Sequence, residues 1–164
     1  MGRQDGGITL IELIIVIAII GIVLAGIFTF LLWGHSTFNR GVDKTELHQE
    51  LNLASELITG EIRYAESLNL LPSAPEEMEA GYNYIYYDQE SRALVLIDGG
   101  NFRQFGAPLI STAEFWQEGN ILHYLLEATK RDKVYGLESS VLLLNITASP
   151  SGGEKQHTMK YKKP

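Results

Sequence analysis

Cysteine is absent from all 164 residues of this chain, and proline occurs only five times. Without cysteine, the protein has no disulfide framework, no thiolate metal site and no lipid anchor attached through a cysteine. A domain in an oxidising compartment would therefore be stabilised by packing alone. The net charge is −7, and this acidic balance argues against nucleic-acid binding, which usually depends on a basic face.

Residue patterns that carry catalysis or metal binding are also missing. The four histidines are scattered, without the close pair or neighbouring acids that a zinc site needs. Ser139 and Ser140 lack the glycine-flanked turn of a hydrolase nucleophile. The glycine pairs lack the lysine and the spacing of a phosphate-binding loop. We therefore expect a non-enzymatic protein with no metal and no cofactor. The alternative of a membrane-tethered enzyme is disfavoured because the sequence shows no catalytic arrangement of residues.

Three smaller groups of residues have both a structural and a functional interpretation. Glu76, Glu77 and Glu79 could bind calcium, but the alternation of Asp or Asn with Gly is missing, so we expect a solvated charge run. Alternating tyrosines near position 84 either pack against the core or helix, or form an exposed surface for subunit contacts. The last group consists of four lysines near the C-terminus, Lys155, Lys160, Lys162 and Lys163. We expect them to form a solvated basic tail rather than a patch that binds an anionic partner.

One long apolar run dominates the N-terminal part of the chain. From Ile8 to Trp33 the only polar residues are Thr9, Glu12 and Thr29. About 20 apolar residues suffice to cross the hydrocarbon core of a bilayer, so this run predicts a membrane-spanning helix. A carboxylate inside such a run is expensive, at roughly 2.5–3.5 kcal/mol on insertion scales, and Glu12 therefore needs an explanation.

Three kinds of membrane segment fit such a run. A removable secretory signal could be cut after Val23-Leu24-Ala25, with a mature start at Gly26, but the apolar stretch continues to Trp33, where a soluble protein should begin. A plain single-pass anchor leaves the segment uncut. A specialised anchor is processed at its front edge. The charges that flank the segment are too balanced to set its orientation.

The front edge of the segment carries a resemblance. Gly7-Ile8-Thr9-Leu10-Ile11-Glu12, followed by some twenty apolar residues, resembles the signal of type IV prepilins and type II secretion pseudopilins. In that family a membrane prepilin peptidase cuts after the glycine and methylates the new N-terminus. The resemblance implies that Gly7 precedes the cut, that Ile8 becomes the methylated N-terminus, and that Glu12 pairs with the amino group of a neighbouring subunit during assembly.

The resemblance also implies partners and a location. The partners would be a prepilin peptidase, other pilin or pseudopilin subunits and an inner-membrane assembly platform, without nucleic acid. The chain would cross the cytoplasmic membrane once, with its N-terminus inside and its C-terminal domain outside. The alternative is an uncut single-pass binding or sensor protein, which would tolerate Glu12→Ala and would not depend on the peptidase.

Details of the chain point towards a minor subunit of this family. Major pilins often carry a proline where this chain has Thr29, and a cysteine pair that this chain lacks. The first mature residue would be Ile8, where the family most often has Phe or Met. Phe38-Asn39-Arg40-Gly41 and Leu142-Leu143-Leu144-Asn145 are similar to segments of J-type minor pseudopilins. We therefore expect a minor or initiation-complex component.

The remaining pattern predicts an α+β fold. Residues 1–7 form a leader, residues 8–33 a transmembrane assembly helix, residues 34–71 an amphipathic extension of that helix, and residues 72–164 an antiparallel β domain. Pro72 would end the helix, at about Leu70. The apolar face of the extension, spaced by three or four residues, consists of Leu47, Leu51, Ala54, Ile58, Ile62 and Ala65.

The region after the helix predicts strands. A hairpin is expected from residues 82–87 and 93–97, joined by the turn Asp88–Ser91. Further strands are expected at Ile121–Ala128, Val141–Thr147 and Thr112–Trp116.

Overall fold

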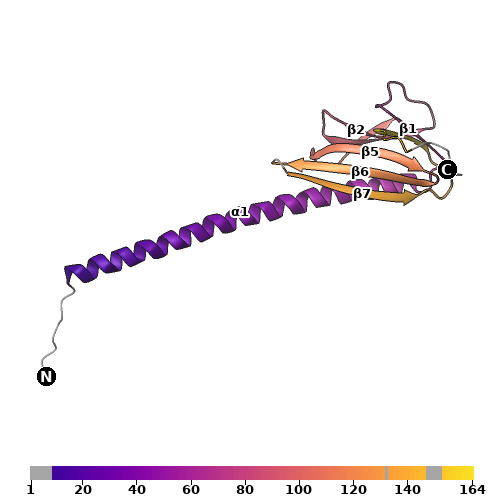
Figure 1. The fold of residues 1–164 in the computed structure, drawn as a ribbon. Helices are drawn as coiled ribbons and strands as arrows, with labels where there is room; N and C mark the ends of the chain where they lie inside the picture. The colour runs from indigo at the N-terminus through magenta and orange to yellow at the C-terminus, as the bar shows by residue number, and fades with distance from the viewer. Residues whose placement is uncertain (1–8, 132, 147–152) are drawn as a thin grey trace. The chain divides into compact units, whose positions relative to one another are not determined.

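The computed structural model describes residues 9–131, 133–146 and 153–164. One helix, α1 (Leu10–Ile62), precedes eight strands in this part of the chain (Figure 1). The chain divides into two compact units, Met1–Val42 and Asp43–Pro164, and α1 contributes to both. The first unit is helical throughout its described part, from Leu10 onward, and all the strands belong to the second.

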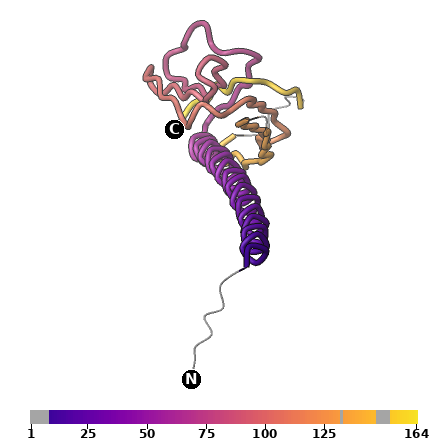
Figure 2. Tube along the Cα trace, turned by 90° about the vertical axis from the view of Figure 1, so that its left-hand side faces the viewer, coloured from indigo at the N-terminus to yellow at the C-terminus, as the bar shows by residue number. Residues whose placement is uncertain are grey.

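The strands of the second unit form two antiparallel sheets, and Figure 2 traces the path of the chain through them. A five-stranded sheet has the order β1-β8-β2-β3-β4, and a three-stranded sheet has the order β5-β6-β7. Backbone hydrogen bonds between Phe115 and Gln156 connect β5 to the segment just before β8. The strands are β1 (Ser67–Leu71), β2 (Asn83–Asp88), β3 (Ala93–Asp98), β4 (Asn101–Phe105), β5 (Ile110–Glu118), β6 (Ile121–Lys130), β7 (Lys133–Leu142) and β8 (Thr158–Lys162).

The helical face expected from the sequence is the face that α1 buries within the second unit. The apolar side chains spaced three or four residues apart from Leu47 to Ile62 are all buried, and Ala65 follows them into the core. Each buried Leu or Ile contributes about 1.5–3 kcal/mol. This arrangement of a helix on antiparallel sheets confirms the α+β fold class, with two sheets where the sequence predicts one.

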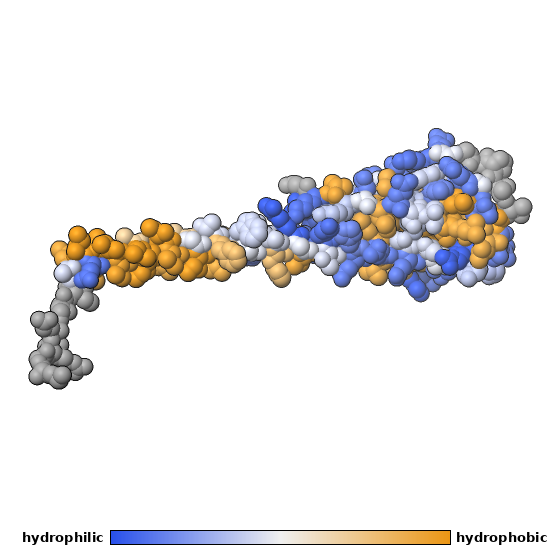
Figure 3. Space-filling model, turned by 60° about the horizontal axis from the view of Figure 1, so that its bottom comes forward, coloured by the Kyte–Doolittle hydropathy of each residue, from blue (hydrophilic) through white to orange (hydrophobic). Residues whose placement is uncertain are grey.

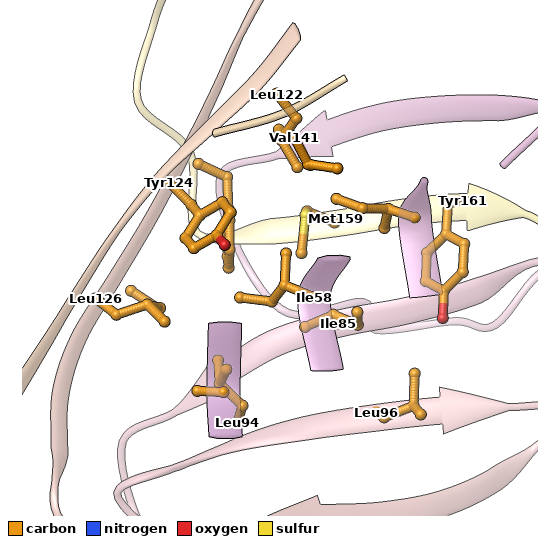
Figure 4. Close-up of a cluster of buried hydrophobic side chains, with 14 of the residues drawn as sticks. Ile58, Ile85, Leu94, Leu96, Leu122, Tyr124, Leu126, Val141, Met159 and Tyr161 are labelled. Carbon is orange, nitrogen blue, oxygen red and sulfur yellow. The ribbon is translucent and has the colours of Figure 1, made fainter. Parts of the chain in front are cut away.

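The main core lies between α1 and both sheets (Figure 4). Ile58 of the helix meets Ile85, Leu94 and Met159 of the five-stranded sheet and Tyr124 of the three-stranded sheet. The hydroxyl of Tyr124 lies 2.7 Å from Ser55 Oγ and 3.3 Å from Thr59 Oγ1, so the one polar end of this ring is satisfied by the helix. Both sheets are therefore organised around one short stretch of helix.

The helix ends earlier than the sequence predicts. The expected end was about Leu70, but α1 ends at Ile62 and Ser67–Leu71 form β1, so the extension over 34–71 is wrong in its last nine residues. The reason is tertiary, because the amide of Leu144 donates to the carbonyl oxygen of Arg63 (3.0 Å) and Glu66 donates to Lys162 (2.8 Å). Pairing with β8 satisfies the backbone of this segment, so no proline is needed to end the helix.

Most of the expected strands are present. The hairpin is confirmed as β2 and β3, and the turn between them is held by the carboxylate of Asp88, which accepts from the amide and the hydroxyl of Ser91 (3.1 and 2.5 Å). The strands at 112–116 and 121–128 are confirmed as parts of β5 and β6. The strand expected at Val141–Thr147 is wrong over residues 143–146, because β7 covers Lys133–Leu142 and only its last two residues fall in the expected range; Thr147 lies outside the described residues.

The solvated basic tail is also wrong. Residues 158–162 form β8, which lies between β1 and β2 and buries Thr158, Met159 and Tyr161. The four lysines of the expected tail all pair with acids from earlier in the chain: Lys155 with Glu114, Lys160 with Glu79, Lys162 with Glu66, and Lys163 with Glu61 and Asp98. The basic character thus complements acids of the same chain.

The alternating tyrosines form a second, smaller core. Tyr84 is buried with Val95 and Ile97, and Tyr82 and Tyr86 pack around them. Because neighbouring strand residues point to opposite faces and Ile85 lies in the main core, this cluster is on the face of the sheet away from α1. The packing interpretation is therefore correct, although the partner is not the helix.

Candidate functional site

The first turn of α1 is closed by a reciprocal pair of side chains. Glu12 Oε2 accepts hydrogen bonds from the amide and the hydroxyl of Thr9, both at 3.1 Å, and Thr9 Oγ1 accepts from the amide of Glu12 at 3.4 Å. This is a capping box, which satisfies amides that a helix start otherwise leaves without partners. The carboxylate also lies where the helix dipole favours negative charge.

The cap leaves one oxygen of Glu12 open. Both bonds from Thr9 end on Oε2, and within residues 9–131, 133–146 and 153–164 no group donates to Oε1. Glu12 is exposed, so Oε1 is accessible to a donor on another molecule. Sequence reasoning identified Glu12 but missed Thr9 as its partner; the signal was the spacing of three residues between a threonine and a glutamate.

The segment after this cap exposes its apolar side chains on every side. Large apolar residues from Leu10 to Trp33 are between 48% and 76% exposed, and the space-filling view shows them as a nearly continuous orange surface (Figure 3). The helix is long and apolar enough to cross a membrane, and none of its most apolar window is buried. An apolar surface of this extent requires lipid or protein around it.

The helix continues without a break through Thr29, where major pilins often carry a proline. Thr29 Oγ1 donates to the carbonyl oxygen of Ala25 at 2.9 Å, a common way for a threonine to be accommodated within a helix. A proline at this position would remove a backbone hydrogen bond and kink the helix. The segment from Leu10 to Trp33 is helical throughout.

Two of the three site residues predicted from the sequence cannot be placed next to Glu12. Gly7 and Ile8 lie outside the described residues. Their roles, with the cut after Gly7 and the methylated N-terminus at Ile8, stay predictions.

Comparison with known families identifies a motif in the N-terminal segment. Residues 2–28 match the model of the prokaryotic N-terminal methylation motif, whereas no curated protein and no solved structure matches the chain. The N-terminal segment is that of a type IV prepilin-like protein. The motif and the apolar helix together indicate single-pass membrane anchoring and a prepilin-like subunit of a pilus or pseudopilus.

The comparison does not extend to a subtype. The matched region ends at residue 28, before both segments on which the similarity to J-type pseudopilins rests. That similarity stays a prediction.

The other candidate residues do not converge on a second site. Glu79 pairs with Lys160, and the described residues contain no group of three or more potential metal ligands among His, Cys, Asp and Glu. His48 is exposed, and its ring lies 5.3 Å from that of Tyr135. His123 is a strand residue, and its ring stacks on Trp116 with centroids 5.6 Å apart.

Proposed function

We propose that this protein is a minor or initiation-complex subunit of a type IV pilus or type II secretion pseudopilus, cut after Gly7 by a prepilin peptidase and methylated at Ile8. The observation that carries this proposal is the capped carboxylate of Glu12, which stands at the start of an exposed apolar helix and within the matched methylation motif. The minor role rests on Thr29 and on the missing cysteines.

The chemistry follows from the new N-terminus. A cut after Gly7 creates a cationic amino group on Ile8, and a carboxylate of the neighbouring subunit can neutralise it. Attraction between the two charges is strong where water is excluded, but desolvation cancels much of it, so the pair contributes correct register more than net stability. The cap by Thr9 holds the carboxylate in one orientation with Oε1 open for that amine.

The apolar helix supplies the bulk of the assembly energy in this proposal. In the membrane its side chains contact lipid, and in the fibre they would be buried against other pilin or pseudopilin subunits. Residues 1–7 would face the cytoplasm and the β-rich unit would lie outside the membrane. An inner-membrane assembly platform would extract the subunit. No enzymatic activity is proposed for the chain.

The first experiment is intact mass and N-terminal sequencing of the chain, expressed alone and with a prepilin peptidase. We expect a mature chain that begins at N-methylated Ile8 only when the peptidase is present. If Met1 is retained in both cases, the uncut anchor or sensor becomes the better interpretation. A start at Gly26 would instead indicate ordinary secretion.

The role of the carboxylate is tested separately in the assembled fibre. Glu12→Gln keeps the size of the side chain and loses its charge, so we expect normal processing and loss of the subunit from purified fibres. Thr9→Val keeps the charge and loses the cap, and we expect a smaller loss of incorporation. Incorporation of Glu12→Gln at the normal level would refute the charge-pairing role.

A further inference from the structure

The second unit contains an apolar pocket with a carboxylate at its inner end. Its volume is about 270 Å³, and it lies between α1 and the end of β4. Leu53, Ala54, Leu57 and Phe105 form its walls, and Glu50 and Gly106 line it together with Glu56. Leu53 is 58% exposed, so one wall of the pocket is open to solvent. The family motif and the site at Glu12 do not involve this region.

Glu50 is an unusual residue to find inside such a pocket. The residue is only 7% exposed, and in the part of the chain that the structure describes its Oε1 has no hydrogen-bond partner. The backbone N–H of Ala107 donates to the carboxylate, but burial is the larger effect and raises the pKa of Glu50. A buried acceptor without a donor costs about 1–3 kcal/mol, so the site is incomplete.

The backbone opposite this carboxylate is shaped to admit it. Gly106 has a φ of +86°, and a Cβ built on it would lie 1.6 Å from Glu50 Oε1. Only glycine leaves this space free and adopts this conformation without strain. The carboxylate therefore occupies a position that the β4–β5 connection keeps open for it.

No cation of the described chain completes the site. The charged groups nearest to Glu50 on α1 are acids, and the negative charge of Glu46 raises the pKa of Glu50 further. Lys130 of β6 is held by the neighbouring acid Glu46 and by Asp43. The connection after β4 supplies only the amide of Ala107. The pocket is thus apolar along its walls and negative at one end.

We propose that this pocket receives a lysine side chain of another protein. The four-carbon stem would pack against Leu53, Leu57 and Phe105, and the ammonium group would donate to the carboxylate of Glu50. A divalent metal is a poor occupant because it requires several oxygen ligands, and the walls are apolar. A basic partner is favoured over a second copy of this chain because two chains of net charge −7 repel each other.

The test uses the full chain in lipid nanodiscs with labelled leucine and alanine methyl groups. The probes are N-acetyl-lysine N-methylamide and its norleucine analogue, which has a similar stem without the ammonium group. We expect the lysine probe to shift the signals of Leu53, Ala54 and Leu57 and to bind about tenfold more tightly than the norleucine probe. Equal binding of the two probes, or no shift with either, would overturn the proposal.

Two variants separate the charge from the walls. Glu50→Gln should abolish the preference for lysine, whereas Leu53→Ala should weaken both probes alike and leave the preference intact. Glu90→Gln, an exposed acid on the β2–β3 turn, is the matched control and should change nothing. Persistence of the lysine preference in Glu50→Gln would contradict the proposal.

Two measurements on the unmodified chain test the proposal even if a variant fails to fold. Lowering the pH through the pKa of Glu50 should remove the preference for lysine, since the probe stays charged while the carboxylate is neutralised. Raising the concentration of the chain itself should leave the Leu53 and Leu57 signals unchanged. If they shift, the occupant is a second copy and the proposed basic partner is wrong.

Discussion

The two parts of α1 have the same backbone conformation and opposite relations to their surroundings. From Leu10 to Val42 the large apolar side chains are exposed all round, while from Asp43 to Ile62 one face is buried beneath two sheets. The hydrogen-bonded ladder is continuous through both parts. Helix formation is common to both parts. Burial alone therefore distinguishes the part that is an anchor or assembly surface from the part that belongs to a structural core.

The polar groups follow the same division. In the first part the notable polar contact is the exposed cap between Thr9 and Glu12. In the second part, Glu61 of the last turn accepts a hydrogen bond of 2.5 Å from the buried Tyr161. Similar bonds therefore have different consequences, because a bond that is shielded from water is costlier to lose.

The largest expected effect is a loss of core packing in the second part only. Ile58 is 0% exposed and Ile22 is 74% exposed. We expect Ile58→Ala to lower the free energy of unfolding of the β-rich unit by about 3–4 kcal/mol and Ile22→Ala to change it by less than about 0.5 kcal/mol. Denaturant titration of the full chain in detergent, followed by near-UV circular dichroism, measures both. Equal losses of unfolding free energy in the two variants would contradict the difference in burial between the two parts of α1.

A smaller effect is expected from the buried polar contact. Tyr161→Phe removes the hydroxyl that donates to Glu61 and should lower the free energy of unfolding by about 1–2 kcal/mol. Burial, and then the bond to Glu61, raise the pKa of Tyr161 above the ordinary tyrosine value. The unfolded chain releases this proton near pH 10, whereas the folded chain retains it.

The sign of the pH dependence follows from that raised pKa. The contribution of Tyr161 is complete below about pH 10 and is lost as the pH rises above it, by up to about 1.4 kcal/mol per pH unit. We therefore expect the stability of the unmodified chain to fall more steeply above pH 10 than that of Tyr161→Phe. Tyr64→Phe, at a residue that is 56% exposed, is the control and should keep the steep fall.

The smallest effect is expected at the exposed cap. Thr9→Val should cost about 0.5–1 kcal/mol, confined to the first turn of α1. Hydrogen exchange of the amides from Leu10 to Leu13 should become faster, while the unfolding of the β-rich unit stays unchanged. A loss of stability in that unit would show that the two parts are coupled more strongly than the comparison implies.

The features that sequence reasoning found are those with local signals. The apolar run, the motif around Glu12, and the three- and four-residue spacing from Leu47 to Ile62 can all be read within a short window. The hairpin of β2 and β3 is likewise flanked by turn residues whose side chains close the turn. These elements needed no knowledge of distant partners.

The features that it missed depend on distant partners. In β8 the buried residues alternate with Lys160 and Lys162, and the lysines are satisfied only by acids that lie about 80 to 100 residues earlier. A window around residue 160 therefore looks like a solvated tail. The end of α1 was missed for the same reason, since β1 forms only because β8 is beside it.

The position of β8 between β1 and β2 sets the order of events while the chain is being made. Its neighbours β1 and β2 are synthesised more than 65 residues before it, yet they pair with β8 and not with each other. The five-stranded sheet therefore cannot close until Lys162 has left the ribosome, and pairings between such distant segments form slowly. During that interval the apolar helix is already complete, so the first part is available for insertion into a membrane before the second part can fold.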